Sequence, residues 1–179
     1  VLQFLLIYFI WWTVFQSYSG TEILGYTKSS ILTYVLVAAL LRAVILSSRT
    51  TDVVNQINDG SIVNFFIKPL DFINTYITKD LADKTLNIFF AILEVSLLVL
   101  VLKPEIIFQA DPTILILTLL AAISAAIIFF CLSLIVSLLA FWVESSWAFL
   151  FLMTIFLEGF GGGLFPIDIL PKAIYNLLM

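Results

Sequence analysis

The chain has 179 residues, of which 63% are hydrophobic and 11% charged, whereas soluble domains average about 45–50% and about 25%. A soluble domain of this length could not bury so much apolar surface, so the composition indicates a membrane protein. There is no histidine, the one cysteine lies in an apolar run and the net charge is −4, which excludes histidine triads, histidine zinc sites, disulfide frameworks and a basic surface for nucleic acid.

Five apolar segments predict membrane-spanning helices, because a helix needs about 20 apolar residues to cross about 30 Å of hydrocarbon. A single helix over residues 114–157 would be about 66 Å long, so the chain is predicted to reverse at residues 144–146. The predicted fold class is all-α, a polytopic transmembrane helical bundle forming one domain over residues 1–179. The five segments are residues 1–15, 30–46, 86–102, 114–143 and 147–157.

The distribution of basic residues predicts the orientation. Residues 48–84 contain four of the eight lysines and arginines, and no other connection contains more than one. Cytoplasmic loops carry an excess of lysine and arginine. We therefore expect the loop 48–84 and the residue-1 side of the protein to be cytoplasmic, and the tail 159–179 to face outside.

The first part of the cytoplasmic loop has the pattern of an amphipathic helix. Residues 52–58 place Val53, Val54 and Ile57 on one helical face, and Gly60 follows where a helix stop is expected. Two interpretations remain open. Such helices can merely tether two spans, or they can form a docking platform for a cytoplasmic partner.

The rest of the loop predicts a second element that lies along the membrane. Residues 62–67 are apolar and end at Lys68 and Pro69. Residues 71–84 have apolar positions at three- and four-residue steps with charged residues opposite. This pattern predicts a helix in the membrane interface that turns into the third span.

Three charged residues lie in or beside the predicted spans. Arg42 is four or five residues from the cytoplasmic end of its span, within reach of the lipid headgroups. Glu94 lies near the middle of the third span, where a charge costs about 2.5–3.5 kcal/mol or more, so it is expected to be protonated, paired or facing a cavity. Glu158 directly precedes a glycine run.

That glycine run predicts a break after the fifth span. Gly159, Gly161, Gly162 and Gly163 lack the GK[ST] sequence of a nucleotide-binding loop, and in a membrane they permit a break or a close helix contact. Pro166 and Pro171 divide the following tail into a turn and a short amphipathic helix that begins near Pro171. We expect residues 159–179 to form an outer re-entrant element whose backbone is covered by protein.

Two stretches of the chain resemble a known family. The segment DGSIVNFFIKPLDFINTYITKDLADK is similar to the cytoplasmic loop of bacterial type-2 ABC (ABC-2) transporter permeases, with the family's positions at Asp59, Gly60, Lys68, Pro69 and Leu70. The tail GGLFPIDILPKAI resembles the family's outer re-entrant stretch, and the order of elements along the whole chain agrees. Because such permeases have six spans, the resemblance implies that this chain shows five of them and lacks the sixth span and both ends.

The resemblance implies a permease of an ATP-driven exporter in a bacterial inner (plasma) membrane. Two permease halves, either two copies or a copy and a homologous permease, would line the pathway among membrane lipids. A separate cytoplasmic ATPase would bind ATP and Mg, and this chain would bind no cofactor or metal and have no catalytic residue. The coupling helix would be residues 52–58 with the Gly60 turn. The ATPase-docking residues implied are Asp52, Val53, Val54, Ile57, Asp59, Gly60, Lys68 and Pro69.

Three other functions are compatible with parts of the sequence. An ion-coupled carrier or channel could bind protons or cations at Glu94 and Glu158. A membrane-embedded enzyme without histidine would need a Ser–Lys or two-carboxylate site, and no serine lies near a lysine at membrane depth. A purely structural membrane subunit is the third alternative. The substrate does not follow from the sequence.

Overall fold

The structure, a computed structural model, describes residues 2–18, 22–23, 25–68, 70–143, 146–163, 165–169 and 171. It is a helical bundle with one two-residue antiparallel ladder in the first connection, which the all-α prediction did not include. The elements are α1 (Leu2–Ser17), β1 (Glu22–Ile23), β2 (Tyr26–Thr27), α2 (Lys28–Ile45), α3 (Thr51–Asn58), α4 (Val63–Ile67), α5 (Phe72–Leu102), α6 (Pro112–Leu138), η1 (Leu139–Phe141), α7 (Ser146–Phe160) and η2 (Ile167–Ile169).

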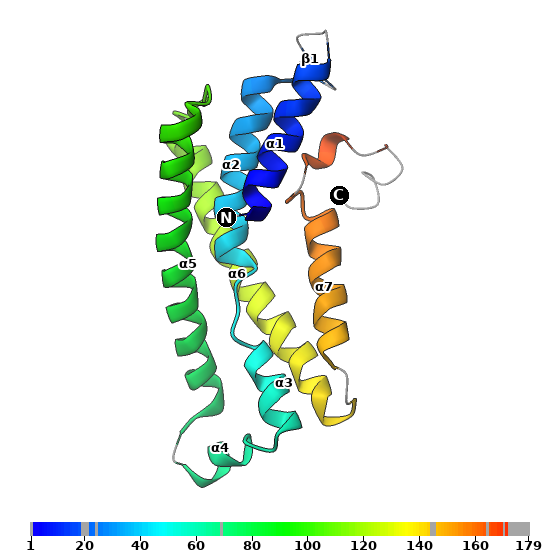
Figure 1. The fold of residues 1–179 in the computed structure, drawn as a ribbon. Helices are drawn as coiled ribbons and strands as arrows, with labels where there is room; N and C mark the ends of the chain where they lie inside the picture. The colour runs from blue at the N-terminus through cyan, green and yellow to red at the C-terminus, as the bar shows by residue number, and fades with distance from the viewer. Residues whose placement is uncertain are drawn as a thin grey trace.

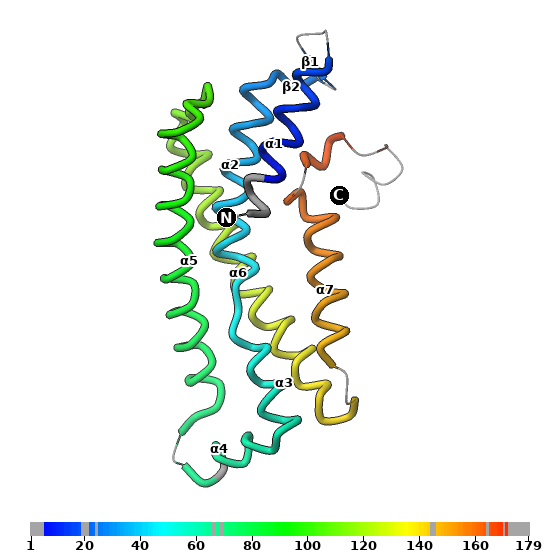
Figure 2. Tube along the Cα trace, in the orientation of Figure 1, coloured from blue at the N-terminus to red at the C-terminus, as the bar shows by residue number. Residues whose placement is uncertain are grey.

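The long helices run along one direction, and the short elements lie at the two ends of the bundle (Figure 1). We call the end with α3 and α4 the inner end, and the end with β1 and β2 the outer end. The chain passes between the two ends through α2, α5 and α6, and α7 then returns from the inner end beside α6 (Figure 2). This return agrees with the predicted reversal, although residues 144–145 lie outside the described residues.

The apolar helices follow the five predicted segments, but they differ in length. Among the described residues, three helices are long and apolar enough to cross a membrane: Lys28–Ile45, Phe72–Leu102 and Pro112–Phe141. Leu6–Ser17 and Ser146–Phe160 are shorter apolar helices. Most of their large apolar side chains face outward. This distribution is typical of a protein whose solvent is lipid, where burial of an apolar side chain brings little gain.

Local sequence explains where the spans begin. Thr27 caps α2, since its hydroxyl accepts a hydrogen bond from the Ser30 amide at 3.3 Å. Asp111 caps α6 in the same way by accepting from the Thr113 amide at 2.9 Å, and Pro112 occupies the first turn, where its missing N–H costs nothing. These caps satisfy backbone groups that the helices themselves leave open.

The third span differs from its prediction, because α5 is one continuous helix of 31 residues. The expected turn between an interfacial helix over residues 71–84 and a span over residues 86–102 is absent. Asp71 caps the start of α5, and no glycine or proline interrupts it. The helix is about 46 Å long at 1.5 Å per residue, about half as long again as the hydrocarbon layer.

The inner part of α5 buries two charged residues together with Tyr76, one of its predicted apolar positions. Tyr76, Asp80 and Lys84 are buried, whereas Ile73 and Leu81 are exposed. The helix therefore turns a polar face toward the rest of the chain. The reason is the loop before α3, whose charged and carbonyl groups lie against this face and replace water as its partner.

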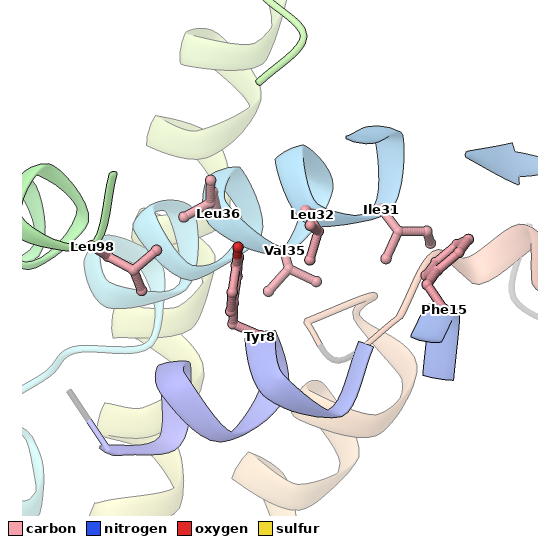
Figure 3. Close-up of a cluster of buried hydrophobic side chains, with 7 residues drawn as sticks. All are labelled: Tyr8, Phe15, Ile31, Leu32, Val35, Leu36 and Leu98. Atoms are coloured by element: carbon pink, nitrogen blue, oxygen red, sulfur yellow. The ribbon is translucent and has the colours of Figure 1, made fainter. Parts of the chain in front are cut away.

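Two clusters of buried apolar side chains hold the bundle together. The larger cluster joins α1 and α2 with Leu98 of α5, and Figure 3 shows Tyr8 and Phe15 of α1 facing α2. The smaller cluster lies at the inner end, where Val54 of α3 packs with Ala140 of η1 and Leu150 of α7. The first cluster fixes the outer half of the bundle. The second attaches the short helix α3 to the hairpin formed by α6 and α7.

A charge placed in the inner cluster should destabilise the protein. Val54→Asp should lower the free energy of unfolding by about 3–5 kcal/mol, because the carboxylate would be buried without a partner. Asn55→Asp is the matched control, since Asn55 is exposed on the same helix and a surface substitution changes stability by about 0.5 kcal/mol at most. Thermal melting of the purified protein in detergent measures both. Equal melting temperatures for the two variants would contradict the packing of Val54.

Candidate functional site

The connection between α2 and α3 is held on α5 by charged groups. The Lys84 ammonium donates to the backbone carbonyl oxygen of Ser47 at 2.5 Å and forms an ion pair with Asp80 at 2.9 Å. Arg49 Nε lies 2.7 Å from Asp83 Oδ1. Because Lys84 and Asp80 side chains are only 10% and 8% exposed, their pair is largely out of solvent. These contacts fix the position at which α3 begins.

The helix α3, the predicted coupling helix, presents its apolar face to the bundle. Val53 and Val54 are buried, Asp52 and Ile57 are partly buried, and α3 contacts α6, η1 and α7. On its other side, the Tyr76 hydroxyl of α5 donates to Gln56 Oε1 at 2.8 Å. The predicted docking residues Val53 and Val54 therefore anchor α3 inside this chain and have no surface left for a partner.

The exposed part of the predicted docking segment follows α3. Asp59 and Gly60 are exposed, and Gly60 has a φ of +75°, which permits the tight turn out of α3. The Ser61 amide donates to Asp59 Oδ1 at 2.8 Å. Hydrogen bonds from Ser61, first from its side chain and then from its backbone, hold the pKa of Asp59 below its ordinary value, so this carboxylate stays charged.

An apolar surface that the sequence analysis did not single out lies at the inner end. We call it the α4–α5 corner, which comprises α4, Lys68, Leu70, Asp71 and the first turn of α5. Four of its large apolar side chains are exposed, Ile67 by 76%, and Lys68 beside them is exposed as well. Pro69 lies outside the described residues. In the sequence, the apolar run at residues 62–67 indicates that an apolar surface could form here. Whether these side chains are exposed depends on how α4 and α5 pack, which the sequence does not show. The exposed apolar residues are Val63, Ile67, Leu70 and Ile73.

Aromatic side chains support this corner from inside. The rings of Phe65, Phe72 and Tyr76 lie with centroids 4.9–6.1 Å apart. The Lys79 ammonium lies 4.8 Å from the centroid of the Tyr76 ring, which is within the range of a cation–π interaction. Because the Tyr76 hydroxyl also donates a hydrogen bond to Gln56 of α3, Tyr76 contacts both the corner and α3.

The second group of predicted residues forms an ion pair inside the bundle. Arg42 of α2 and Glu158 of α7 are hydrogen-bonded to each other, and their side chains are 18% and 26% exposed. Arg42 was expected to reach the headgroups, and no partner of Glu158 could be predicted from the sequence, because 116 positions separate the two residues. Glu94 lies on α5 and lines a cavity beside this pair.

The glycine run ends α7 within the predicted break at residues 159–163. The helix continues through Gly159 to Phe160. The Gly161 amide then donates to the Leu157 carbonyl at 2.9 Å, and Gly162 has a φ of +74°. Gly163 lines the cavities beside the ion pair. The break therefore lies at Gly161 and Gly162.

Two tyrosines, Tyr26 of β2 and Tyr34 of α2, attach the segment after α7 to the outer end of the bundle. The Tyr34 hydroxyl donates to the Gly162 carbonyl and lies 3.4 Å from the Phe165 carbonyl. The Tyr26 hydroxyl donates to Asp168 Oδ2 at 3.0 Å. Burial first, and then this hydrogen bond, raise the pKa of Tyr26, so its hydroxyl remains a donor.

The Tyr34 hydroxyl thus contacts two backbone carbonyls of this segment, and the re-entrant element stays a prediction. Pro166 is buried and precedes η2, and Pro171 is exposed. The short amphipathic helix predicted after Pro171 lies outside the described residues.

The two ion pairs at the inner end should contribute very differently to stability. Lys84→Met should lower the free energy of unfolding by about 3–5 kcal/mol, because buried Asp80 would lose its cation. Arg49→Met removes an equal charge from a side chain that is 54% exposed, so we expect a loss of about 0–1 kcal/mol. Thermal melting in detergent compares them. Similar losses would contradict the burial of the Lys84–Asp80 pair.

Gly162 and Gly159 offer a matched pair of substitutions with opposite expected effects. Gly162→Ala forces a side chain into a left-handed conformation, at a cost of about 1–2 kcal/mol, and its Cβ would lie 2.8 Å from the Tyr34 hydroxyl. Gly159→Ala lies in a helix with open space around the new Cβ, which should stabilise by up to about 1 kcal/mol. The melting temperature should fall by about 2–8 °C in the first variant. An unchanged melting temperature for Gly162→Ala would contradict the assigned turn, and a fall for Gly159→Ala would contradict the helical position of Gly159.

Comparison with known proteins assigns the chain to a family. The family model of the ABC-2 family transporter protein matches residues 1–179. No curated protein and no solved structure matches the chain. The match covers the whole length, including the inner corner and the glycine turn described above. The chain therefore belongs to the ABC-2 family of transporter membrane proteins.

Proposed function

We propose that the chain is the transmembrane permease subunit of an ATP-driven ABC exporter, and that a separate cytoplasmic ATPase drives it. Permeases of this family generally work with such an ATPase. In this proposal the five apolar helices all span a bacterial inner membrane, with the inner end of the bundle in the cytoplasm. ATP and Mg are bound by the ATPase, and a second permease copy or a homologous permease completes the pathway.

The observation that carries the proposal is the exposed apolar surface of the α4–α5 corner. Lys84 lies level with Ser47 at the end of α2, and the helix extends a further 12 residues beyond Lys84 to Phe72, or about 18 Å at 1.5 Å per residue. The stretch from Lys84 to Leu102 already covers about 27 Å, close to the hydrocarbon thickness of about 30 Å. The corner thus projects beyond the hydrocarbon, where exposed apolar residues favour a protein partner.

The contacts of α3 support a route by which this partner could move the bundle. The corner and α3 share Tyr76, and α3 packs on η1 and α7 through Val54. A force on the corner would therefore reach the hairpin of α6 and α7 through packed side chains. In this proposal Asp59, Gly60, Lys68 and the exposed apolar residues contact the ATPase, while Val53 and Val54 transmit the motion.

The carrier or channel alternative gains no support from the family match. In the structure Glu158 is hydrogen-bonded to Arg42, so an ion-binding role would require this pair to separate. Support for that alternative would be transport that continues without ATP and without an ATPase subunit.

The corner can be tested by co-purification with the ATPase. Ile67→Asp and Ile73→Asp place charges on exposed apolar positions, so the permease should fold normally while recovery of the ATPase falls at least about tenfold, the effect of losing about 1.4 kcal/mol of binding free energy. Recovery is measured as the ratio of ATPase to permease after purification in detergent. Basal yield and elution volume of the permease report folding.

Phe108→Asp is the matched control, because Phe108 is 85% exposed but lies in the connection at the outer end. This variant should retain the ATPase at the wild-type ratio. Wild-type recovery with both corner variants would contradict the docking surface. Failure of the wild-type permease to retain any ATPase would contradict the proposed function itself.

A further inference from the structure

Two pairs of aromatic side chains are exposed where the chain turns from α6 into α7. We call residues 139–143 and 146–151 the hairpin tip, and residues 144–145 between them lie outside the described residues. Trp142 is 78% exposed and its ring lies edge-on to that of Phe141, with centroids 6.2 Å apart. Trp147 is 63% exposed and stacks on Phe151 at 5.3 Å. The tip thus presents large aromatic surfaces that the described part of the chain leaves uncovered.

The length of α6 places the hairpin tip at a defined depth. Together with η1 it forms an apolar rod over Pro112–Phe141, 30 residues, or about 45 Å at 1.5 Å per residue. Asp111, which caps the outer start of this rod, is exposed, and an aspartate side chain belongs outside the hydrocarbon. A tilt of about 20°, the average for membrane-spanning helices, leaves a vertical span of about 42 Å. A bilayer with its headgroups is about 40–45 Å thick, so a rod that starts in the outer headgroup layer ends in the inner one.

The packing of α3 supports the same level. Ser47 lies beside Lys84, which the length of the outer part of α5 places near the inner edge of the hydrocarbon. The helix α3 begins shortly afterwards at Thr51, and its Val54 packs with Ala140 of the hairpin tip. Figure 1 shows α3 beyond the end of α2 and beside the inner end of α6, with α4 farther out still. The tip therefore lies just outside the hydrocarbon, and the α4–α5 corner lies beyond the tip.

The headgroup layer suits both parts of an exposed indole. The ring is apolar, which disfavours water, whereas the N–H is a hydrogen-bond donor, which disfavours hydrocarbon. Neither Trp142 nor Trp147 donates a hydrogen bond to a described residue, so both N–H groups need an acceptor outside the described bundle. Ester carbonyl and phosphate oxygens of lipids provide acceptors at the level where the ring still meets acyl chains. Tryptophan is enriched at membrane–water interfaces for this reason.

The charges of the chain distinguish the hairpin tip from the corner. The sequence has no lysine or arginine between residues 104 and 171, so the tip has no nearby basic side chain to pair with an acidic lipid. The corner, in contrast, combines its apolar residues with Lys68 and Asp71. Contact at the tip therefore depends on the aromatic rings and their N–H groups, which neutral lipids can satisfy.

We propose that the hairpin tip binds the lipid headgroup layer at the inner end of the bundle. The aromatic rings lie among the uppermost parts of the acyl chains, and Trp142 and Trp147 donate hydrogen bonds to ester carbonyl or phosphate oxygens of neutral lipids. Because Val54 of α3 packs on this tip, the membrane surface holds one of the neighbours of α3. The proposal concerns the lipid alone and does not depend on the ATPase.

Brominated lipids measure the depth of each tryptophan, because bromine quenches tryptophan fluorescence at short range. The full protein is placed in nanodiscs of phosphatidylcholine whose acyl chains carry bromine either close to the headgroup or close to the chain end. Two variants keep one of the four tryptophans, Trp142 or Trp147, with the others changed to phenylalanine. Each should lose more fluorescence with the shallow bromine than with the deep bromine, because the indole lies at the upper end of the chains.

Ile127→Trp in the protein without native tryptophans is the matched control. Ile127 is 60% exposed and lies near the middle of the same helix, α6. This variant should show the opposite order and lose more fluorescence with the deep bromine.

A spin label gives a second measurement that leaves all four tryptophans in place. Val143→Cys in the Cys131→Ser protein carries a nitroxide at an exposed position of the hairpin tip. Collisions with oxygen, which dissolves in hydrocarbon, and with a water-soluble nickel complex give the depth of the label by electron paramagnetic resonance. This depth should fall in the headgroup layer of a phosphatidylcholine nanodisc.

Absence of quenching by either lipid would overturn the proposal, since protein or water would then cover both tryptophans. A greater loss with the deep bromine would overturn it as well, because the indoles would lie within the hydrocarbon. If the single-tryptophan variants do not fold, a Val143 label in water or in the hydrocarbon has the same force. The ATPase takes no part in these measurements, so failure to retain it contradicts the proposed function and leaves this lipid surface unaffected.

Discussion

Polar contacts between helices are the constraint on which this structure depends. In lipid a chain gains little by burying its apolar side chains, and most large ones here face outward. The positions of the helices are then determined by polar and charged groups, which cannot form hydrogen bonds with lipid tails. Lys84 ties α5 to the end of α2, Arg42 ties α2 to Glu158 of α7, and Tyr34 ties α2 to the turn after α7. Each of the three contacts involves α2 or the connection that directly follows it.

This arrangement gives the short helix α3 its importance. It is held on one side by Tyr76 of α5 and on the other by the packing of Val54 against Leu150 of α7. It therefore lies between the part of the bundle built on α2 and α5 and the hairpin of α6 and α7. Because α3 is attached to both neighbours, it connects these two parts of the bundle.

The sequence predicted those parts of the fold that depend on local composition. The five apolar segments, the reversal before α7 and the helix at residues 52–58 follow from hydropathy, length and glycine position, and the structure has helices at each. The sequence did not predict that α5 is continuous. The amphipathic pattern of residues 71–84 fits a separate interfacial helix as well as it fits the first part of a long helix, and the contacts of the neighbouring loop that favour the long helix are not visible in the sequence. The sequence also did not predict which residues that are far apart in the chain form pairs. Arg42 and Glu158 are each only a charge in an apolar stretch until the fold brings them together.

The unbroken helix α5 has a mechanical consequence. It reaches from the corner at one surface of the molecule to Lys103 at the other, and along its outer part it is fastened to α2. No glycine, proline or loop interrupts it to absorb a bend. The two ends of α5 are therefore joined by a single stiff rod, so that a displacement of one end is carried along the helix to the other.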